Sequence, residues 1–403
     1  MVFRHFFKKS SIYLDHAAGT PVASFVFEKM KPYFTEHFGN PSSLYRLGTE
    51  AKKALQESRV RISTYLKTQS DTIIFTGSGT LSCNMAILGI AKKHQEQGKH
   101  IITTSVEHKA VLEAMKVLEA RGFSVTYLPV DEYGNVTVKQ VVDALQDDTI
   151  LISCMFANNE IGTVYPIAEI GRALLQWRKK KKTVYPYFHS DACQASPYYD
   201  LSVEPLHVDL LTLNGSKMYG PKGVGILYCR RGVTLSPLIV GGGQEQGMFA
   251  GTENVPAIVG ASYAFDAVQS LRKESYIEVK ALRDYFWECL IDAVPDIRLT
   301  GPSLLEKNRL PHNIHVQFLG IEAETLVLYL DEYGIVCGTG SACTSESTDV
   351  SHVLHACGVS SNDAASSIRF TLGKDTTKKD IDYVMKVLPS VVKTLRSTQK
   401  FSH

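Results

Sequence analysis

The feature that most constrains the fold of this chain is a regular alternation of short apolar runs with longer helical patterns. Apolar runs of strand length occur at residues 71–75, 100–105, 123–130, 149–157, 185–191, 208–214 and 224–230. Helical patterns separate several of them, for instance over residues 109–121 and 167–182. Strands that alternate with helices typically form a mostly parallel sheet with helices on both faces, so the sequence predicts an α/β protein.

The length and composition predict two domains rather than one. The chain has 403 residues, of which 44% are hydrophobic, enough for a large core. Near residue 262 a long helical pattern leads into a second α/β part, with strand-like runs at residues 312–318 and 367–372. We therefore expect a large domain over residues 15–262 and a smaller C-terminal α/β domain over residues 263–403, on which residues 1–14 pack.

Charge and cysteine content argue against several classes of function. There are 43 basic and 41 acidic side chains, so nothing favours nucleic acid or an anionic membrane as the main partner. No run approaches the roughly 18 apolar residues of a membrane span. The cysteines include no Cys-x-x-Cys pair, which favours reduced thiols over a zinc knuckle or a redox motif. We expect a soluble cytoplasmic protein.

A glycine-containing turn at residues 76–80 predicts a site for an anion. The segment Thr-Gly-Ser-Gly-Thr follows a strand and opens a helix, where free N–H groups and the helix dipole attract phosphate. An ordinary strand–helix turn is the alternative. A dinucleotide site is disfavoured, because Ser82 stands where the third glycine belongs and no acid occurs in residues 97–105.

A lysine and a carboxylate at two strand ends suggest a particular cofactor. Lys217 follows the strand at residues 208–214, and Asp191 ends the strand at residues 185–191. Ligands of α/β proteins bind at this edge of the sheet, although a surface lysine is the commoner explanation in general. The pair suits pyridoxal phosphate, since the lysine can form a Schiff base and the acid keeps the pyridine nitrogen protonated.

Further candidates come from cysteine and histidine. Cys343 lies in the glycine- and serine-rich stretch GTGSACTSES, and is either an ordinary loop cysteine or a thiol that the loop carries to a site. Cys193, beside Asp191, is interpreted as a packing residue. The pairs His312–His315 and His352–His355 have a spacing that could bind metal, but they lack partners in a zinc pattern, so we expect no resident metal.

Taken together, the motifs resemble those of cysteine desulfurases, which are class-V aminotransferase-like pyridoxal-phosphate enzymes of fold type I. The matching segments, in order over residues 12–390, are YLDHAAGTP, FGNPSS, EHKAVLE, NNEIGT, HSDACQ, NGSKMYGPKG, GGGQEQGMFAGTEN, GSACTS and SSIRFTLG. The resemblance implies the fold-type-I transferase architecture, a large domain with a mostly parallel sheet and a smaller C-terminal α/β domain. Its extended GSACTS loop resembles the long-loop group, which usually hands sulfur to an iron–sulfur scaffold protein.

The resemblance also implies how the cofactor is held. Lys217 would bind it covalently, Asp191 would pair with the pyridine nitrogen, and His108 would stack on the ring and help to move protons. The phenolic-oxygen side and the phosphate would be held by Gln194, Asn159, Gly79, Thr80, Asn214 and Ser216. Thr252 would reach the phosphate in the other subunit, which implies a homodimer. Asn214 and Ser216 depart from the serine and histidine that are common at these positions, so the details of phosphate binding are open.

The implied reaction converts L-cysteine to L-alanine. Arg369, with Asn159, would bind the substrate carboxylate through its planar fork. Lys217 and His108 would act as catalytic residues, and Cys343 would accept the sulfur as a persulfide for delivery to an acceptor. Cys343 could also serve as a transient iron–sulfur ligand. A selenocysteine lyase or an aminotransferase of the same fold is the alternative, and a catalytically idle cofactor-binding subunit is a further one.

Overall fold

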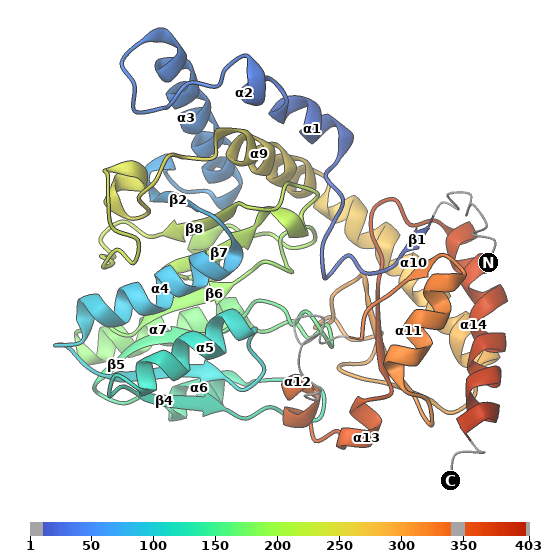
Figure 1. Cartoon of the computed structure of the whole chain (residues 1–403). Coiled ribbons are helices and arrows are strands. Elements are labelled where there is room, and N and C mark those ends of the chain that lie inside the picture. The colour runs from blue at the N-terminus through green and yellow to red at the C-terminus, as the bar shows by residue number, and fades with distance from the viewer. Residues whose placement is uncertain (1–10, 340–350, 400–403) are drawn as a thin grey trace.

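The computed structural model describes residues 11–339 and 351–399. Its larger part is built on a seven-stranded sheet (Figure 1). In spatial order the strands are β2 (Ile73–Thr76), β8 (Gly225–Cys229), β7 (Leu210–Asn214), β6 (Tyr187–Asp191), β5 (Thr149–Ser153), β3 (His100–Thr104) and β4 (Ser124–Leu128). All strand pairs from β7 to β4 are parallel, and β8 runs antiparallel to both β7 and β2. The predicted α/β class is confirmed.

Helices cover both faces of this sheet and create two separate apolar cores. One core packs α3 (Arg46–Leu66), α7 (Ile167–Lys181) and α9 (Val255–Ser270) against one face. The other packs α4 (Gly79–His94) and α5 (Lys109–Glu119) against the opposite face. Shorter helices of this part are α1 (Ser24–Met30), α2 (Pro32–Thr35), α6 (Val138–Asp143) and α8 (Val203–Leu206). Strands covered on both sides can be apolar throughout, which explains the unbroken runs in the sequence.

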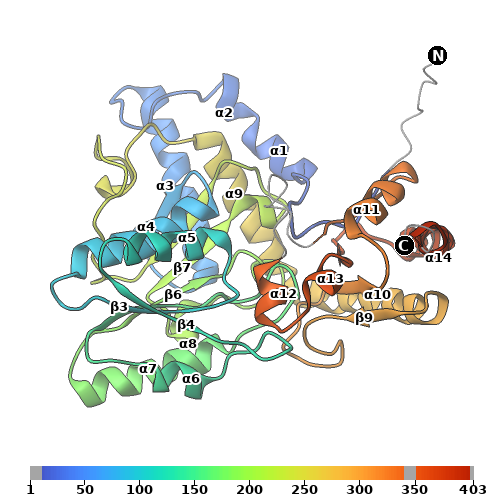
Figure 2. The ribbon, with the colours of Figure 1, turned by 60° about the horizontal axis from the view of Figure 1, so that its bottom comes forward.

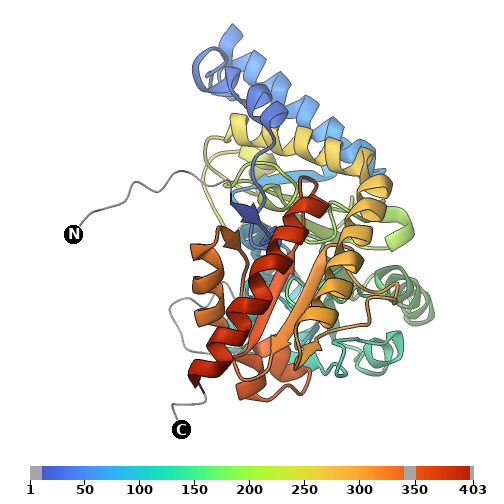
Figure 3. The same ribbon diagram turned by 90° about the vertical axis from the view of Figure 1, so that its right-hand side faces the viewer.

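The smaller part is a second α/β unit beside the first (Figure 1), and it faces the viewer in Figure 3. Its antiparallel sheet has the order β12 (Ser367–Thr371), β10 (Asn313–Phe318) and β9 (Ile297–Leu299). Apolar side chains of α10 (Arg272–Ala293), α11 (Ala323–Glu332) and α14 (Lys378–Gln399) complete its core. The N-terminal β1 (Ile12–Tyr13) pairs with β11 (Ile335–Val336), and Leu14 is buried in the same core.

The chain passes from the larger to the smaller part later than residue 262, the expected boundary. That position lies inside α9, and Phe265 of the same helix is still buried in the larger core. Helix α10 begins after Leu271, and its Val279 belongs to the smaller core. A second difference concerns α12 (His352–Ala356) and α13 (Ser361–Ala364), which return the chain to the larger core after the smaller one has begun (Figure 2).

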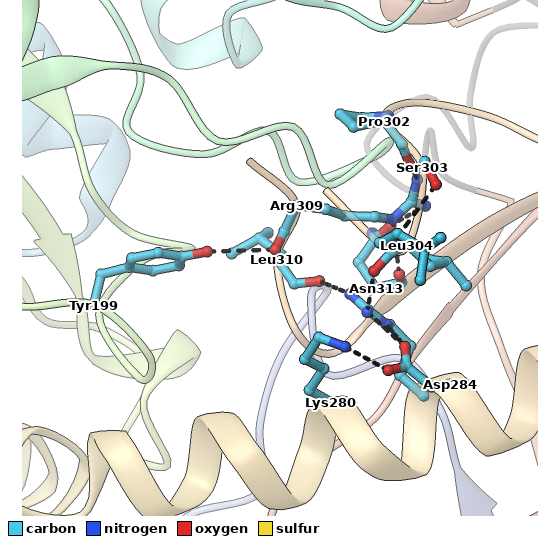
Figure 4. Close-up of polar contacts among 11 residues, drawn as sticks. Tyr199, Lys280, Asp284, Pro302, Ser303, Leu304, Arg309, Leu310 and Asn313 are labelled. Carbon is cyan, nitrogen blue, oxygen red and sulfur yellow. Dashed lines mark hydrogen bonds and ion pairs between the residues drawn. The ribbon is translucent and has the colours of Figure 1, made fainter. Parts of the chain in front are cut away.

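Two buried arginines fix the segment that enters β10 (Figure 4). Arg309 donates to the carbonyl oxygens of Thr300 at 2.8 Å and Asn313 at 3.2 Å. Arg283 of α10 donates to the carbonyl of Leu310 at 3.1 Å. Since each guanidinium carries several N–H groups in a fixed plane, these two side chains replace the backbone partners that an irregular buried segment lacks.

Two findings concern what the described part of the chain does not contain. None of its helices has the length and apolar character needed to span a lipid bilayer. Within residues 11–339 and 351–399, no group of three or more histidine, cysteine or acidic side chains is placed to hold a metal ion.

Candidate active site

A cavity of about 340 Å³ opens at the edge of the large sheet where the parallel strands β6 and β7 end. Nine of the residues predicted to form the site line it, namely Gly79, Thr80, His108, Asn159, Asp191, Gln194, Asn214, Lys217 and Arg369. They come from both parts of the chain, because Arg369 belongs to β12 of the smaller sheet. The expected position, a pocket at the carboxyl ends of strands, follows from the topology of α/β folds.

One end of the cavity is formed by the start of α4. Ser78 caps this helix, its Oγ accepting from the N–H of Leu81 at 3.2 Å. A Cβ added at Gly79 would lie 3.1 Å from Cys193 Sγ and 3.2 Å from Asn214 Cβ. The glycine therefore lets the helix terminus lie directly against the wall of the cavity, where its N–H groups and dipole favour an anion.

Asp191 lies at the end of β6 and is nearly buried. Its Oδ1 accepts from the N–H of Cys193 at 2.9 Å, and the Cys83 thiol lies 3.6 Å from its Oδ2. Behind it, the fully buried His189 bridges Ser153 Oγ at 2.9 Å and Thr212 Oγ1 at 3.0 Å. Burial lowers the pKa of His189 to about 4, so this ring is neutral and serves to fix the strand ends.

Lys217 lies opposite the N-terminal segment. Its Nζ donates to the carbonyl oxygens of Ala17 at 2.9 Å and Ala18 at 2.7 Å. Gln194 Nε2 donates to the same Ala17 oxygen at 3.0 Å. The lysine amine, the glutamine amide and the backbone of residues 17–18 thus form one connected group on the cavity wall.

His108 precedes α5 and caps it, with Nδ1 accepting from the N–H of Ala110 at 3.1 Å. An acceptor at Nδ1 carries no proton, so the neutral imidazole holds its proton on Nε2. The cap also holds the ring at the cavity, whose wall includes His108.

Arg369 and Asn159 meet at another part of the wall. Arg369 Nη1 donates to the Asn159 carbonyl at 2.9 Å, and Nη2 contacts Asp15 Oδ1 at 2.8 Å. Asn158 shapes the turn that presents Asn159, since its Oδ1 accepts from the N–H groups of Glu160 at 2.8 Å and Ile161 at 3.1 Å. A buried guanidinium in this setting is suited to a carboxylate ligand.

Three predicted residues are not among those that line the cavity. Ser216 lies next to it, with its N–H and Oγ both 3.2 Å from Asn214 Oδ1, so it orients that asparagine. Thr252 is exposed and contributes nothing to the cavity of its own chain. Cys343 lies outside the described residues.

Several lining residues were not predicted from the sequence. Ala17 and Ala18 contribute backbone carbonyls, which the side-chain pattern of a sequence does not reveal. Met155 follows a buried strand and has no polar side chain that would mark it as a site residue. Cys193 was interpreted as a packing residue, yet it lines the cavity. The sequence could have indicated that Cys193 lines the cavity, because it lies two residues after Asp191, just beyond the end of a strand.

Comparisons with known proteins identify the family of the chain. Residues 12–384 match the family model of aminotransferase class V, and the chain belongs to this family. A cysteine desulfurase IscS of Clostridium botulinum is 46% identical over 96% of the chain and 95% of its own length. A solved NifS-like protein has a TM-score of 0.88 with 36% identity, covering 96% of this chain and all of that one. SspA, solved in complex with cysteine, has a TM-score of 0.77 with 35% identity, over 89% of this chain and 98% of its own. The resemblance drawn from the motifs is confirmed.

Proposed function

We propose that this protein is a pyridoxal-phosphate-dependent cysteine desulfurase that converts L-cysteine to L-alanine and receives the sulfur on Cys343. The observation that carries the proposal is the convergence of Lys217, Asp191 and Arg369 on one cavity. An amine, a carboxylate and a guanidinium at these places match a covalently bound pyridinium cofactor and an amino-acid substrate. The cysteine desulfurase relatives support the same choice.

The residues fit the cofactor. Gly79 leaves open a cradle that a side chain would fill, at a helix N-terminus suited to a phosphate, with Thr80 and Asn214 beside it. Asp191 would pair with the pyridine nitrogen, and Gln194, Asn159 and His108 would hold the ring, with Ser216 acting through Asn214. When bound, pyridoxal phosphate supplies an electron sink for the bonds at the substrate Cα.

The chain's own groups would then perform three tasks. Arg369 binds the substrate carboxylate and sets its orientation. Lys217 and His108 move protons to and from the substrate. The Cys343 thiolate attacks the substrate sulfur, so that the C–S bond breaks, an S–S bond forms, and L-cysteine and the Cys343 thiol become L-alanine and a Cys343 persulfide.

The product persulfide implies further partners. A sulfur acceptor, such as an iron–sulfur scaffold protein, would take the sulfur from Cys343, which could also ligate the nascent cluster briefly. A homodimer would supply Thr252 to the phosphate in the neighbouring subunit. A cytoplasmic setting keeps the thiols reduced. Selenocysteine lyase or aminotransferase activity is the alternative assignment of the same cavity.

The test is turnover of L-cysteine by the purified chain, with alanine and sulfide both quantified and no keto acid added. Wild-type protein should release alanine, and the loop peptide should gain one sulfur atom on Cys343 by mass spectrometry. Cys343→Ala should bind L-cysteine but release no alanine at a useful rate. Cys229→Ala, at a half-buried cysteine outside the cavity, is the matched control. Alanine formation that requires a keto acid, or full turnover by Cys343→Ala, would refute the proposal.

A further inference from the structure

Asp15 occupies a place to which neither the motifs nor the proposed reaction assigns a role. It follows β1 and lies beside the end of β12. The Thr371 N–H donates to the Leu14 carbonyl at 2.7 Å, and the His16 N–H donates to the Thr371 carbonyl at 3.3 Å. The Asp15 carbonyl itself accepts from Tyr13 Oη at 2.9 Å. Backbone contacts on both sides therefore fix the point from which the Asp15 side chain extends.

That side chain contacts the guanidinium at the cavity. Asp15 Oδ1 lies 2.8 Å from Arg369 Nη2, and the two side chains are only 14% and 2% exposed. Arg369 Nη1 is held separately, by the Asn159 carbonyl at 2.9 Å. Two partners from distant segments thus hold the two terminal nitrogens of one planar group. Because a guanidinium is a rigid planar group, contacts to both of its terminal nitrogens restrict the direction in which it faces.

The backbone around Gly338 leaves room for this pair. Gly338 and Arg369 exchange two hydrogen bonds, of 3.1 Å and 2.7 Å. A Cβ added at Gly338 would lie 3.0 Å from Asp15 Oδ1 and 3.2 Å from Oδ2. An alanine at this position would therefore press on the carboxylate without contacting the guanidinium first. This gives an independent way to disturb Asp15.

We propose that Asp15 is a positioning residue for the substrate carboxylate, acting through Arg369 to orient the guanidinium before substrate arrives. The inference rests on the proposed function. A flexible arginine side chain loses rotamer freedom when it binds a carboxylate. An arginine that is already held in the binding orientation loses less. The Asp15 carboxylate also places a negative charge 2.8 Å from this buried cation.

A competing interpretation makes the opposite prediction. If Asp15 merely occupied the place of the substrate carboxylate, removing it would free the guanidinium, and carboxylate ligands would bind more tightly. If Asp15 positions the guanidinium, removing it weakens their binding. The direction of the change in affinity therefore separates the two.

The experiment compares Asp15→Ala, Asp15→Asn and Gly338→Ala with wild-type holoenzyme. Apparent KM and kcat are measured for L-cysteine. Binding of L-alanine and of ethylamine, which is alanine without its carboxylate, is followed by the absorbance of the bound cofactor. Asp375→Asn is the matched control, since Asp375 is exposed, pairs with Lys374 and does not line the cavity.

Asp15→Ala should raise the L-cysteine KM and the L-alanine Kd at least about tenfold, with a much smaller change in kcat. Asp15→Asn, which keeps an acceptor oxygen, should restore part of the affinity, and Gly338→Ala should weaken L-alanine binding in the same direction. Ethylamine binding and the Asp375→Asn variant should change less than about twofold.

Tighter or unchanged L-alanine binding in both Asp15 variants would overturn the inference, as would an equal loss for ethylamine. If Asp15→Ala does not fold, Asp15→Asn and Gly338→Ala decide the matter. A wild-type protein that does not convert L-cysteine would instead refute the proposed function, so the two failures are distinguishable.

Discussion

Glu107 shows, at the scale of one residue, how burial changes a carboxyl group next to the active site. It precedes His108 and is fully buried. Its Oε1 accepts from the Met155 N–H at 2.7 Å and from Thr104 Oγ1 at 3.0 Å. Its Oε2 has no hydrogen-bond partner in the described part of the chain. Burial, with a smaller contribution from the charge of Asp191, raises the pKa of Glu107 to about 8, although the hydrogen bonds from Met155 and Thr104 act in the opposite direction.

This environment predicts a pH-dependent contribution to stability. The pKa is raised in the folded state, so the folded protein retains a proton that the unfolded chain releases above its ordinary pKa near 4.5. The stabilisation is fully present below that value and is lost as the pH rises towards about 8. Glu107→Gln, which cannot ionise, should therefore lose less stability than wild type between pH 5 and 8.5 in urea unfolding.

The control for this prediction lies on the helix that follows. Glu113 of α5 is exposed and pairs with Lys116, so Glu113→Gln should follow the wild-type pH dependence. Equal slopes for wild type and Glu107→Gln would show that Glu107 is ionised throughout this pH range.

The cofactor-side residues were predictable because each follows a strand end or a glycine turn. Lys217, Asp191 and the turn at residues 76–80 carry their signal locally, in polar residues that interrupt an apolar pattern. Asp15 has no such signal. Its role depends on Arg369, which is distant in the sequence and close only through the pairing of residue 15 with Thr371.

At the scale of elements, the segment from β9 to β10 is held by the two buried arginines, Arg283 and Arg309. Arg309 is fully buried and supplies donors to the carbonyls of Thr300, Pro302 and Asn313. The carbonyls of Thr300 and Pro302 lie between β9 and β10 and belong to neither strand. The guanidinium therefore stands in for the missing backbone partners.

Arg309→Ala should lower the free energy of unfolding by about 3 kcal/mol or more, since it leaves buried acceptors without donors and opens a cavity. Urea unfolding followed by circular dichroism measures this. Arg298→Ala is the matched control on β9, because Arg298 is 63% exposed and lies 3.9 Å from Asp363. That variant should lose less than about 1 kcal/mol. Similar losses for the two variants would contradict the role given to Arg309.

Helices and strands were predicted correctly where burial leaves a clear pattern in the sequence. They were missed where contacts between distant residues determine where an element ends or packs. The runs that became β3, β5 and β6 are buried throughout and read as strands from composition alone. The break at Leu271 between α9 and α10 was not visible, since both flanking segments have helical sequences. The return of α12 to the larger core depends on contacts between residues distant in the sequence, such as those of Val353 and Leu354.

At the scale of the whole molecule, one side of the larger part has the character of an interface. Large apolar side chains are exposed along residues 25–45, namely Phe25, Phe27, Phe34, Phe38, Leu44 and Tyr45. Such a concentration is typical of surfaces that bind another protein. Helix α3 follows directly after residues 25–45. The loop that leads to Thr252 contacts this helix through the ion pair of Glu245 with Arg59. Glu245 also accepts from the Phe75 N–H at 2.7 Å.

The backbone of the loop that leads to Thr252 has an unusual conformation. Glu245 and Gln246 both have left-handed conformations, with φ of 48° and 60°. Such conformations are uncommon for residues other than glycine and persist only where surrounding contacts impose them. The family resemblance implies that Thr252 serves the cavity of a second copy, and in its own chain Thr252 is exposed and does not line the cavity.

This expectation leads to a complementation test between two variants. Lys217→Ala removes the cofactor lysine, and Thr252→Ala removes the contact offered to the partner. In a heterodimer of these two variants, the Thr252→Ala subunit keeps Lys217 and receives an intact Thr252 from its neighbour, so one complete site forms. With distinct affinity tags to isolate it, this heterodimer should regain about half the wild-type activity, because one of the two equivalent sites is complete.

A heterodimer of wild type with the double variant Lys217→Ala/Thr252→Ala is the matched control, since its only lysine-bearing site then lacks Thr252 and should stay impaired. If Thr252 acted within its own subunit, the two results would be exchanged, and that exchange would contradict a shared active site.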